Sequence, residues 1–357
     1  MLRQVLLEKA NLAHAEIVEA AMPALADGAV RLAIESFSVT SNNVTYAAMG
    51  DAFRYWNFFP APEGYGIVPM WGHAWVIESR CPDIAVGERV YGYLPMATHL
   101  DVIPGKVSPS GFTDTAGHRQ PMSPVYNQYA RLAADPEHDP SREAERMVFG
   151  PLFKTGFLIE SFMRREAWFG AEQVILTSAS SKTALSLASV ARHRSPEVAR
   201  IGLTSASNVD FVSSTGLYDR VIAYDTIDEL PKVPSVSVDF AGNADVLRAI
   251  HTHLESGLRY SCLVGATHLD ARTGATADLP GPSPQLFFAP DHAVALFKEV
   301  GPAMASQQIA ESMHRFLSDT AGTVEIERRR GLEAARDVFV EMLGGSVDPK
   351  VGIVIEP

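Results

Sequence analysis

The stretch VILTSASSKTALSLASVAR, residues 174–192, decides the fold of the second half of the chain. It opens with a short apolar run, Val174 to Leu176, of the length and composition typical of a buried strand. Small and hydroxyl-bearing residues follow, and the segment from Thr183 to Arg192 has the pattern of a helix. The stretch therefore predicts a strand, a tight turn and a helix, which together open a βαβ unit.

Similar apolar runs recur downstream at regular spacing, each separated from the next by turn or helical segments. They predict strands at 201–203, 220–223, 236–239, 261–264 and 285–288, with a helix over 244–253. Together with 174–176 these make six strands, the number in a complete doubly wound dinucleotide-binding fold. We therefore expect an α/β fold in this half, with a parallel sheet.

Upstream, β-rich runs at 30–38, 74–80 and 88–93 alternate with turn residues, which suggests a small antiparallel barrel or sandwich. The stretch 99–140 collects Pro, Ser, Gly and Asp and reads as long surface loops, a lid or a domain connection. After residue 290 the pattern becomes helical, and a strand over 351–355 would return to the first sheet. The expected boundaries are 1–145 and 296–357 for the β-rich domain and 146–295 for the parallel-sheet domain.

Composition and charge exclude several classes of protein. A chain of 357 residues exceeds the roughly 250 to 300 that one core supports, so two domains are expected. A net charge of −12 opposes binding to nucleic acid, and the basic run 328–330 is too short to change this. Two cysteines far apart in the chain exclude a disulfide framework. Without a secretory or membrane-spanning segment, we expect a cytoplasmic protein that binds no membrane.

Five segments occur in an order that resembles a known superfamily. They are AIESFSVTSNN (33–43), VGERVYG (86–92), DRVIAYD (219–225), VDFAGN (238–243) and PKVGIV (349–354), and WGH (71–73) lies where many members have Gly-His-Glu. In order and spacing they are similar to the medium-chain dehydrogenase/reductase superfamily, especially its zinc-free, quinone-oxidoreductase-like branch. The resemblance implies a GroES-like catalytic domain, a Rossmann domain, a nicotinamide cofactor and a homodimer.

The turn after the first predicted strand lacks the glycines of the dinucleotide fingerprint. Its small side chains still leave the backbone accessible, its hydroxyl groups can donate to phosphate, and the next helix supplies N–H groups and a positive dipole end. The alternative is a serine-rich N-cap of an ordinary βα unit. The candidate diphosphate contacts are Thr177, Ser178, Ser180, Ser181, Lys182 and Thr183.

Cofactor preference is determined after the second strand, where an acid would bind the adenosine ribose of NAD. No acid occurs there before Asp210, which favours NADP(H) over NAD(H). Ser205, Ser207 and Asn208 are the candidate contacts of the 2′-phosphate, with Lys182 or Tyr224 in support; the alternative is a solvated turn. The later strand ends complete the candidate cofactor site with Phe240, Gly242, Val264 and Gly265.

Catalytic zinc is not expected. Thr40 stands where zinc-dependent relatives would have their first cysteine, and His73 is followed by Ala74 instead of a glutamate. The four-cysteine lobe of structural zinc is also missing from the sequence. We therefore interpret His73 as a packed or hydrogen-bonded histidine.

Without a metal, hydride transfer to a carbonyl or conjugated alkene needs a donor that stabilises negative charge on the substrate oxygen. The resemblance places candidates in a cleft between the domains: Tyr46 as first choice, then Asn42, Asn43 and Tyr55, with Tyr126 and Lys154 more distant. Each tyrosine could equally be a core residue.

The leading hypothesis is a zinc-independent, NADPH-dependent reductase of a ketone, enone or quinone-like small molecule. Two alternatives remain: an NADP(H)-binding protein without redox turnover, and a lyase or dehydratase that uses the same cleft.

Overall fold

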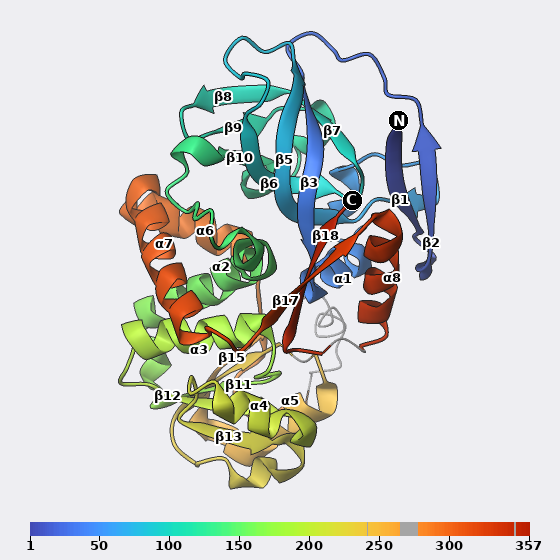
Figure 1. Cartoon of the computed structure of the whole chain (residues 1–357). Helices are drawn as coiled ribbons and strands as arrows, with labels where there is room; N and C mark the ends of the chain where they lie inside the picture. Colours follow the sequence, from blue (N-terminus) through green and yellow to red (C-terminus); the bar gives the residue numbers. More distant parts are fainter. Residues whose placement is uncertain (241, 265–277, 346–347) are drawn as a thin grey trace. The chain divides into compact units, whose positions relative to one another are not determined.

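The computed structural model describes residues 1–240, 242–264, 278–345 and 348–357. The chain divides into two compact units (Figure 1): the first joins Met1–Val148 to Val324–Pro357, and the second comprises Phe149–Thr323. No helix within the described ranges is both long and apolar enough to cross a membrane.

The first unit is built on a nine-stranded sheet and a smaller three-stranded sheet. Its N-terminal strands are β1 (Leu2–Glu8), β2 (Asn11–Ala20), β3 (Val30–Val39), β4 (Tyr65–Gly66), β5 (Pro69–Ser79), β6 (Arg89–Pro95), β7 (His99–Val102), β8 (Pro104–Ser108), β9 (Gly111–Asp114) and β10 (Gln128–Arg131). The C-terminal segment adds β17 (Glu325–Arg330) and β18 (Val351–Glu356). The strand orders are β17-β18-β3-β5-β6-β10-β9-β8, with β7 on β3, and β2-β1-β4.

The alternation of side chains along β5 shows which face of this strand is buried. Ala74 and Val76 are buried, whereas Trp75 and Ile77 on the other face are exposed. Because successive residues of a strand point to opposite faces, one face of β5 packs in the core. The helices of this unit are α1 (Ser41–Ala48) and α8 (Leu332–Leu343), and α2 (Glu143–Arg165) begins in it.

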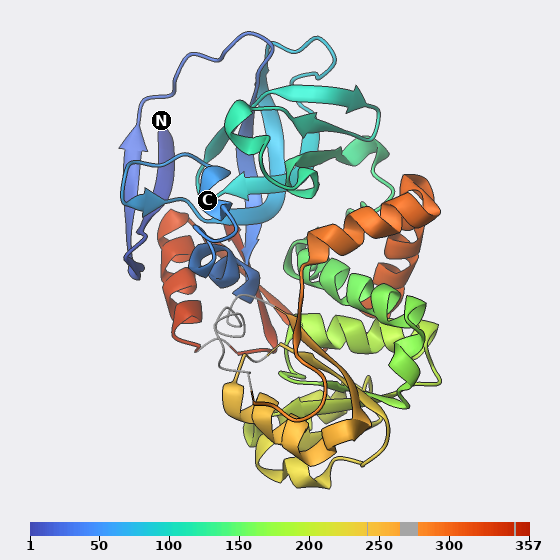
Figure 2. The same ribbon diagram turned by 180° about the vertical axis from the view of Figure 1, so that it is seen from behind.

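The predicted closing strand is confirmed. Within β18, Ile353 to Ile355 pair antiparallel with β3, and the same strand pairs in parallel with β17. The last strand of the chain therefore joins the nine-stranded sheet whose first strand in the sequence is β3, and Figure 2 shows the C-terminus among the strands of this unit.

The expectation of long surface loops or a lid over 99–140 was wrong. This stretch holds β7 to β10 and three single-turn helices, η2 (Gly117–Arg119), η3 (Pro124–Asn127) and η4 (Leu132–Ala134). They are organised around the buried Arg119, which pairs with Asp114 at 2.8 Å and donates to Asn127 and Tyr129. A core built on a charge pair and polar side chains gives no apolar alternation in the sequence, which explains the error.

The second unit contains the predicted parallel sheet, and all six of its strands are confirmed. They are β11 (Gln173–Leu176), β12 (Ala199–Thr204), β13 (Arg220–Ala223), β14 (Ser235–Asp239), β15 (Leu258–Val264) and β16 (Gln285–Phe287). Their order is β13-β12-β11-β14-β15-β16, and every neighbouring pair is parallel. The strand order reverses between β11 and β14, which makes this a doubly wound sheet.

Helices pack on this sheet and define the extent of the unit. They are α3 (Lys182–Arg194), α4 (Val209–Ser214), α5 (Ala244–Leu254), α6 (Ala289–Val300) and α7 (Pro302–Asp319), with single turns η5 (Ala167–Gly170), η6 (Ala206–Asn208), η7 (Tyr224–Glu229) and η8 (Glu255–Gly257). Asp319 of α7 accepts hydrogen bonds from Ser189 and His193 of α3, at 2.7 and 2.9 Å. Because of this attachment α6 and α7 belong to the second unit, and the chain returns to the first unit at Val324, later than the expected boundary at 296.

Candidate functional site

The carboxyl ends of β11 and β14 meet where the strand order reverses, the place at which open α/β sheets bind ligands. Thr177, directly after β11, donates its hydroxyl proton to Asp239 at the end of β14 and accepts from the backbone N–H of Phe240 at 2.9 Å. Thr177 and Asp239 are both completely buried. The Thr177 side chain therefore holds the two strand ends together, whereas the sequence interpretation made it a direct phosphate contact.

The turn after β11 reverses sharply although it contains no glycine. Ser178 adopts the left-handed conformation, with φ of 45°, and its carbonyl accepts from the N–H of Ser181 at 2.7 Å. Its own N–H donates to the Tyr224 hydroxyl at 2.7 Å. Burial, the largest cause, raises the pKa of Tyr224, so the phenol stays protonated. Serine thus occupies the position where glycine would be unstrained.

Replacing Ser178 by glycine is expected to stabilise the protein by about 1 kcal/mol, because glycine adopts a positive φ without the steric cost that a Cβ incurs. Urea unfolding measures the difference. Ser180→Gly is the matched control: Ser180 lies in the same turn outside the left-handed region, so the same change should destabilise. A Ser178→Gly protein no more stable than Ser180→Gly would contradict the strain.

The N-terminus of α3 faces the end of this turn and offers backbone donors. Ser181 caps the helix, its hydroxyl accepting from Ala184 N–H at 3.3 Å, and Lys182 and Thr183 form the first turn, half-buried. Within the described residues, the backbone N–H groups of Ser180 and Thr183 reach no acceptor. Together with the helix dipole, these two N–H groups can bind an anion.

Two glycines outside the turn provide the close packing usually associated with the fingerprint. A Cβ on Gly202 of β12 would lie 3.0 Å from the Ala179 Cβ, and one on Gly156 of α2 would lie 2.7 Å from Leu187 N of α3. The sequence interpretation missed both residues. An isolated glycine within a predicted strand often marks a place where another segment packs closely against the backbone. Gly202 is such a glycine and could have been identified from the sequence.

The end of β12 forms the second part of the candidate cofactor site. Ser205 and Ser207 have hydroxyl oxygens 3.1 Å apart, and Asn208 donates to the Ser180 hydroxyl at 3.3 Å. Asp210 is exposed in the first turn of α4. Asn208 therefore connects the end of β12 directly to the turn after β11, and the side chains of Ser205, Ser207 and Asn208 are neutral.

The remaining cofactor candidates lie at the same edge of the sheet. Phe240 and Gly242 follow β14, and Gly242 has φ of 65°, in the left-handed region. Val264 is the last residue of β15. Gly265 lies outside the described residues.

The oxyanion-donor candidates of the first unit cluster on and beside α1, a helix that the sequence did not predict. Asn43 completes the capping box of this helix, whose N-cap is Thr40: its Oδ1 accepts from Thr40 N–H at 2.6 Å, and its Nδ2 donates to the Pro69 carbonyl at 2.7 Å. Asn43 is buried and both ends of its amide are used. It therefore acts in the structure as a cap and not as a donor to a ligand.

Tyr46 is held by two donors. Its hydroxyl oxygen accepts from Asn42 Nδ2 at 2.7 Å and from the Trp71 indole N–H at 3.1 Å. A phenol oxygen has two acceptor sites, so its proton points away from both donors. Burial, the largest cause, raises the pKa of Tyr46 well above its usual value and keeps the group protonated. Tyr46 is thus a polarised hydrogen-bond donor.

Aromatic rings surround this hydroxyl. Tyr46 packs at ring-centroid distances of 4.7 Å from Tyr55 and 5.4 Å from Tyr93, and the hydroxyls of Tyr55 and Tyr126 lie 3.1 Å apart. Tyr126 is half-buried, whereas Tyr46 and Tyr55 are buried. The structure therefore groups Tyr46, Tyr55, Asn42 and Tyr126, and it adds Trp71 and Tyr93, which the sequence interpretation did not use. Lys154 belongs to α2 in the second unit.

Thr40 and His73, at the positions compared with zinc ligands in the sequence, have other roles in the structure. The Thr40 hydroxyl donates to Asn43 at 3.2 Å. His73 is completely buried on β5, its ring 5.1 Å from that of Tyr91, and neither ring nitrogen has a partner among the described residues. Burial lowers the pKa of His73 to about 3. Within the ranges that the structure describes, no three His, Cys, Asp or Glu side chains are grouped as metal ligands.

Comparisons with known proteins identify a family and a fold. A family model described as "Protein of unknown function (DUF2855)" matches residues 37–348. A search of curated proteins finds no match.

Solved structures match the whole chain. CurA in complex with NADPH from Vibrio vulnificus is 15% identical, with 99% of this chain and 98% of that chain covered and a TM-score of 0.60. A quinone oxidoreductase from Pseudomonas syringae pv. Tomato DC3000 is 15% identical over 100% of both chains, with a TM-score of 0.59. The yhdH oxidoreductase from Salmonella enterica in complex with NADP is 13% identical over 100% of both chains, with a TM-score of 0.55. These similarities confirm the predicted fold, a GroES-like domain plus a doubly wound parallel-sheet domain.

Proposed function

Since the chain belongs to the family described as "Protein of unknown function (DUF2855)", we propose its function from its site: a zinc-independent, NADPH-dependent oxidoreductase that reduces a ketone, enone or quinone-like small molecule. The observation that carries the proposal is the left-handed turn at Ser178, which runs from the central strand β11 into the N-terminus of α3. Two of the solved structures with this fold contain NADPH or NADP, which supports the same cofactor here.

The residues present fit the diphosphate of the cofactor. The N–H groups of Ser180 and Thr183 would donate to its oxygens, with the Thr183 hydroxyl beside them and the charge of Lys182 at the first position of α3. Tyr224, which accepts from Ser178, would keep this loop in its left-handed shape. Ser178 and Ser181 thus shape the cradle, and Ser180, Lys182 and Thr183 bind.

The second-strand residues would hold the adenosine 2′-phosphate. Ser205 and Ser207 present adjacent hydroxyl groups, and Asn208 is fixed by its bond to Ser180. A neutral turn tolerates a phosphate that a carboxylate would repel. This is why we propose NADP(H) and not NAD(H).

The chemistry needs one hydride and one proton. When bound, the cofactor would supply the hydride from its nicotinamide. Tyr46 would donate a hydrogen bond to the substrate oxygen as negative charge develops on it and then pass its proton to that oxygen, and a proton from water would restore the phenol. Asn42 and Trp71, by donating to the Tyr46 oxygen, orient its proton toward the substrate and strengthen the bond that it donates. A preoriented donor of this kind is compatible with reduction without a metal.

The decisive experiment measures NADPH and NADH binding by calorimetry and NADPH consumption with ketones, enones and quinones. Ser207→Asp is expected to weaken NADPH binding by about tenfold or more and to shift the preference toward NADH, because a carboxylate repels the 2′-phosphate. Ser207→Asn, neutral and of the same shape, is the control and should keep the preference for NADPH.

Three results would count against the proposal. If the protein does not bind NADPH, the proposed cofactor site is wrong. If Ser207→Asp leaves the ratio of NADPH affinity to NADH affinity unchanged, Ser207 does not contact the cofactor. Binding without consumption of NADPH across the panel would favour a sensor over a reductase.

A further inference from the structure

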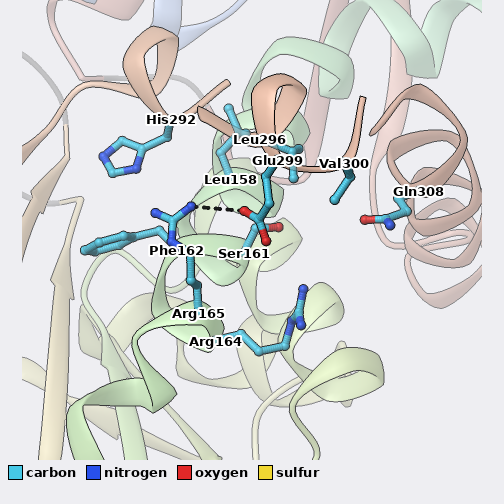
Figure 3. Close-up of a pocket in the computed structure, with 10 residues that line it drawn as sticks. All are labelled: Leu158, Ser161, Phe162, Arg164, Arg165, His292, Leu296, Glu299, Val300 and Gln308. Carbon is cyan, nitrogen blue, oxygen red and sulfur yellow. Dashed lines mark hydrogen bonds and ion pairs between the residues drawn. The ribbon is translucent and has the colours of Figure 1, made fainter. Parts of the chain in front are cut away.

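We propose that a cavity in the second unit, between α2, α6 and α7, binds a small aromatic carboxylate. The cavity (Figure 3) has a volume of about 280 Å³, and none of the cofactor candidates is among its lining residues. Its lining includes Phe162, Arg164 and Arg165 of α2 and His292, Leu296 and Glu299 of α6. The proposal does not depend on the proposed function.

One wall of the cavity suits a flat ring. The Phe162 ring lies edge-on to His292 at 4.9 Å, and His292 stacks on Phe287 at 4.0 Å with an angle of 11° between the rings. Leu296 and Val300 of α6 continue the apolar lining. Burial lowers the pKa of His292, so its ring is neutral near pH 7 and adds to the aromatic wall without adding charge. Aromatic ligands favour stacked or edge-on contacts with such walls.

Two guanidinium groups, those of Arg165 and Arg164, add positive charge to the cavity lining. Arg165 contacts Glu299 at 3.4 Å and Glu166 at 3.6 Å, and both distances are long for a charge-assisted hydrogen bond. Figure 3 shows the Arg165 and Glu299 side chains converging within the cavity, with Phe162 beside Arg165. A ligand carboxylate could form the short bidentate contact with Arg165 that Glu299 does not make.

Arg164 is the second arginine of the lining. It shares the buried carboxylate of Glu160 with Arg194, at 3.2 and 3.1 Å, so one acid serves two guanidinium groups. The lining itself has two arginines against the single acid Glu299. Glu160 and Glu166 lie beside these arginines outside the lining, so Arg165, whose contacts with acids are all long, is the group that would pair with a ligand carboxylate.

Size limits the ligand. Ligand pockets usually begin at about 300 Å³, so this cavity is at the small end and accepts one ring with a short acid side chain. The apolar wall and the arginines together thus specify an aromatic carboxylate and disfavour a neutral ring or a bare inorganic anion.

The test uses calorimetry on the full chain with phenylacetate and, as the neutral counterpart, phenylacetamide. We expect saturable binding of phenylacetate that is about tenfold tighter than binding of the amide. Arg165→Gln should weaken phenylacetate binding about tenfold, while Arg315→Gln, an exposed arginine of α7 outside the cavity, should leave it unchanged.

A second variant keeps the charges and removes the space. Val300→Trp should abolish phenylacetate binding while the thermal melting temperature confirms folding, and it replaces Arg165→Gln as the test if that variant does not fold. Equal affinities for acid and amide, no saturable binding, or equal affinities of Val300→Trp and wild type would each overturn the proposal.

Discussion

Replacing His73 by leucine should flatten the loss of stability of the protein between pH 6.5 and about 3. Burial is the main reason why the pKa of His73 falls from 6.5 to about 3 in the folded state. The unfolded chain therefore binds a proton in this window that the folded protein does not bind. The contribution of neutral His73 to the free energy of unfolding is fully present above pH 6.5. Below that pH it declines by roughly 1.4 kcal/mol per pH unit.

The surroundings of His73 explain why it stays neutral. The charged or titratable groups near it are Glu143, Arg146, Arg89, His138 and Tyr91, whose ring lies 5.1 Å away. Glu143, which pairs with Arg89 at 2.7 Å and with His138 at 2.8 Å, favours a charge on His73 and raises its pKa, but burial, the largest cause, and the neighbouring cations outweigh it. Both ring nitrogens lack a described partner, so protonation would add a buried charge without a hydrogen-bond acceptor.

Glu143 produces a second, separate pH effect. Despite its partial burial, its bonds to Arg89 and His138 lower its pKa from 4.5 to about 2. Its contribution is present above pH 4.5 and is lost as the pH falls toward 2. Above pH 4.5 the slope is free of the Glu143 effect, but His99, His251 and His292 also have lowered pKa values and contribute to it. The effect of His73 is therefore the difference in slope between wild type and His73→Leu.

Chemical unfolding of wild type and His73→Leu from pH 7 to 4 measures this slope. His118→Leu, at an exposed histidine of η2, is the control and should keep the wild-type slope. At pH 7 leucine should cost little, because it removes two buried nitrogens that make no described hydrogen bond. A His73→Leu protein with the slope of the control would show that His73 is protonated or hydrogen-bonded in the folded state.

The parallel sheet was readable from the sequence because its strands are buried on both faces. Such strands are short, continuous apolar runs, and the run at Val174 to Leu176 corresponds to β11 almost residue for residue. The first unit was harder to predict. The hairpin of β1 and β2 and the helix α1 were missed because β2 has no buried residue and α1 begins with Ser-Asn-Asn, which has no apolar periodicity.

The candidate site was predictable in position more than in roles. That the turn at 177–183 follows the central strand could be read from order alone, but the left-handed backbone of Ser178 has no signature in a serine. Asn43 looks like Asn42 in the sequence, yet one caps α1 and the other donates to Tyr46. Hydrogen-bond partners distant in the chain, such as Pro69 for Asn43, separate such roles, and local sequence does not contain them.

Replacing Tyr46 by phenylalanine is expected to lower the turnover of the proposed reductase by about 10² to 10³, the usual effect of removing one oxyanion donor. NADPH affinity should remain at the wild-type value, because Tyr46 belongs to the first unit and the cofactor candidates belong to the second. The split between turnover and cofactor affinity distinguishes a donor to the substrate from a residue that merely supports the fold.

Tyr46→Phe also has a structural cost that must be measured separately. It leaves the Trp71 indole N–H and the Asn42 amide without their acceptor, which should lower the free energy of unfolding by about 1 to 3 kcal/mol. Trp71→Phe removes one of these donors but keeps the Tyr46 hydroxyl. We expect it to reduce turnover about tenfold, because the phenol loses one orienting bond and keeps its proton.

Steady-state kinetics with the best substrate of the panel, NADPH calorimetry and urea unfolding of each variant complete the test. Tyr65→Phe is the matched control, a half-buried tyrosine of β4 outside the aromatic group around Tyr46, and it should retain full turnover. If a folded Tyr46→Phe protein turns over as fast as Tyr65→Phe, the donor is a different residue, and the paired hydroxyls of Tyr55 and Tyr126 would be the next group to replace.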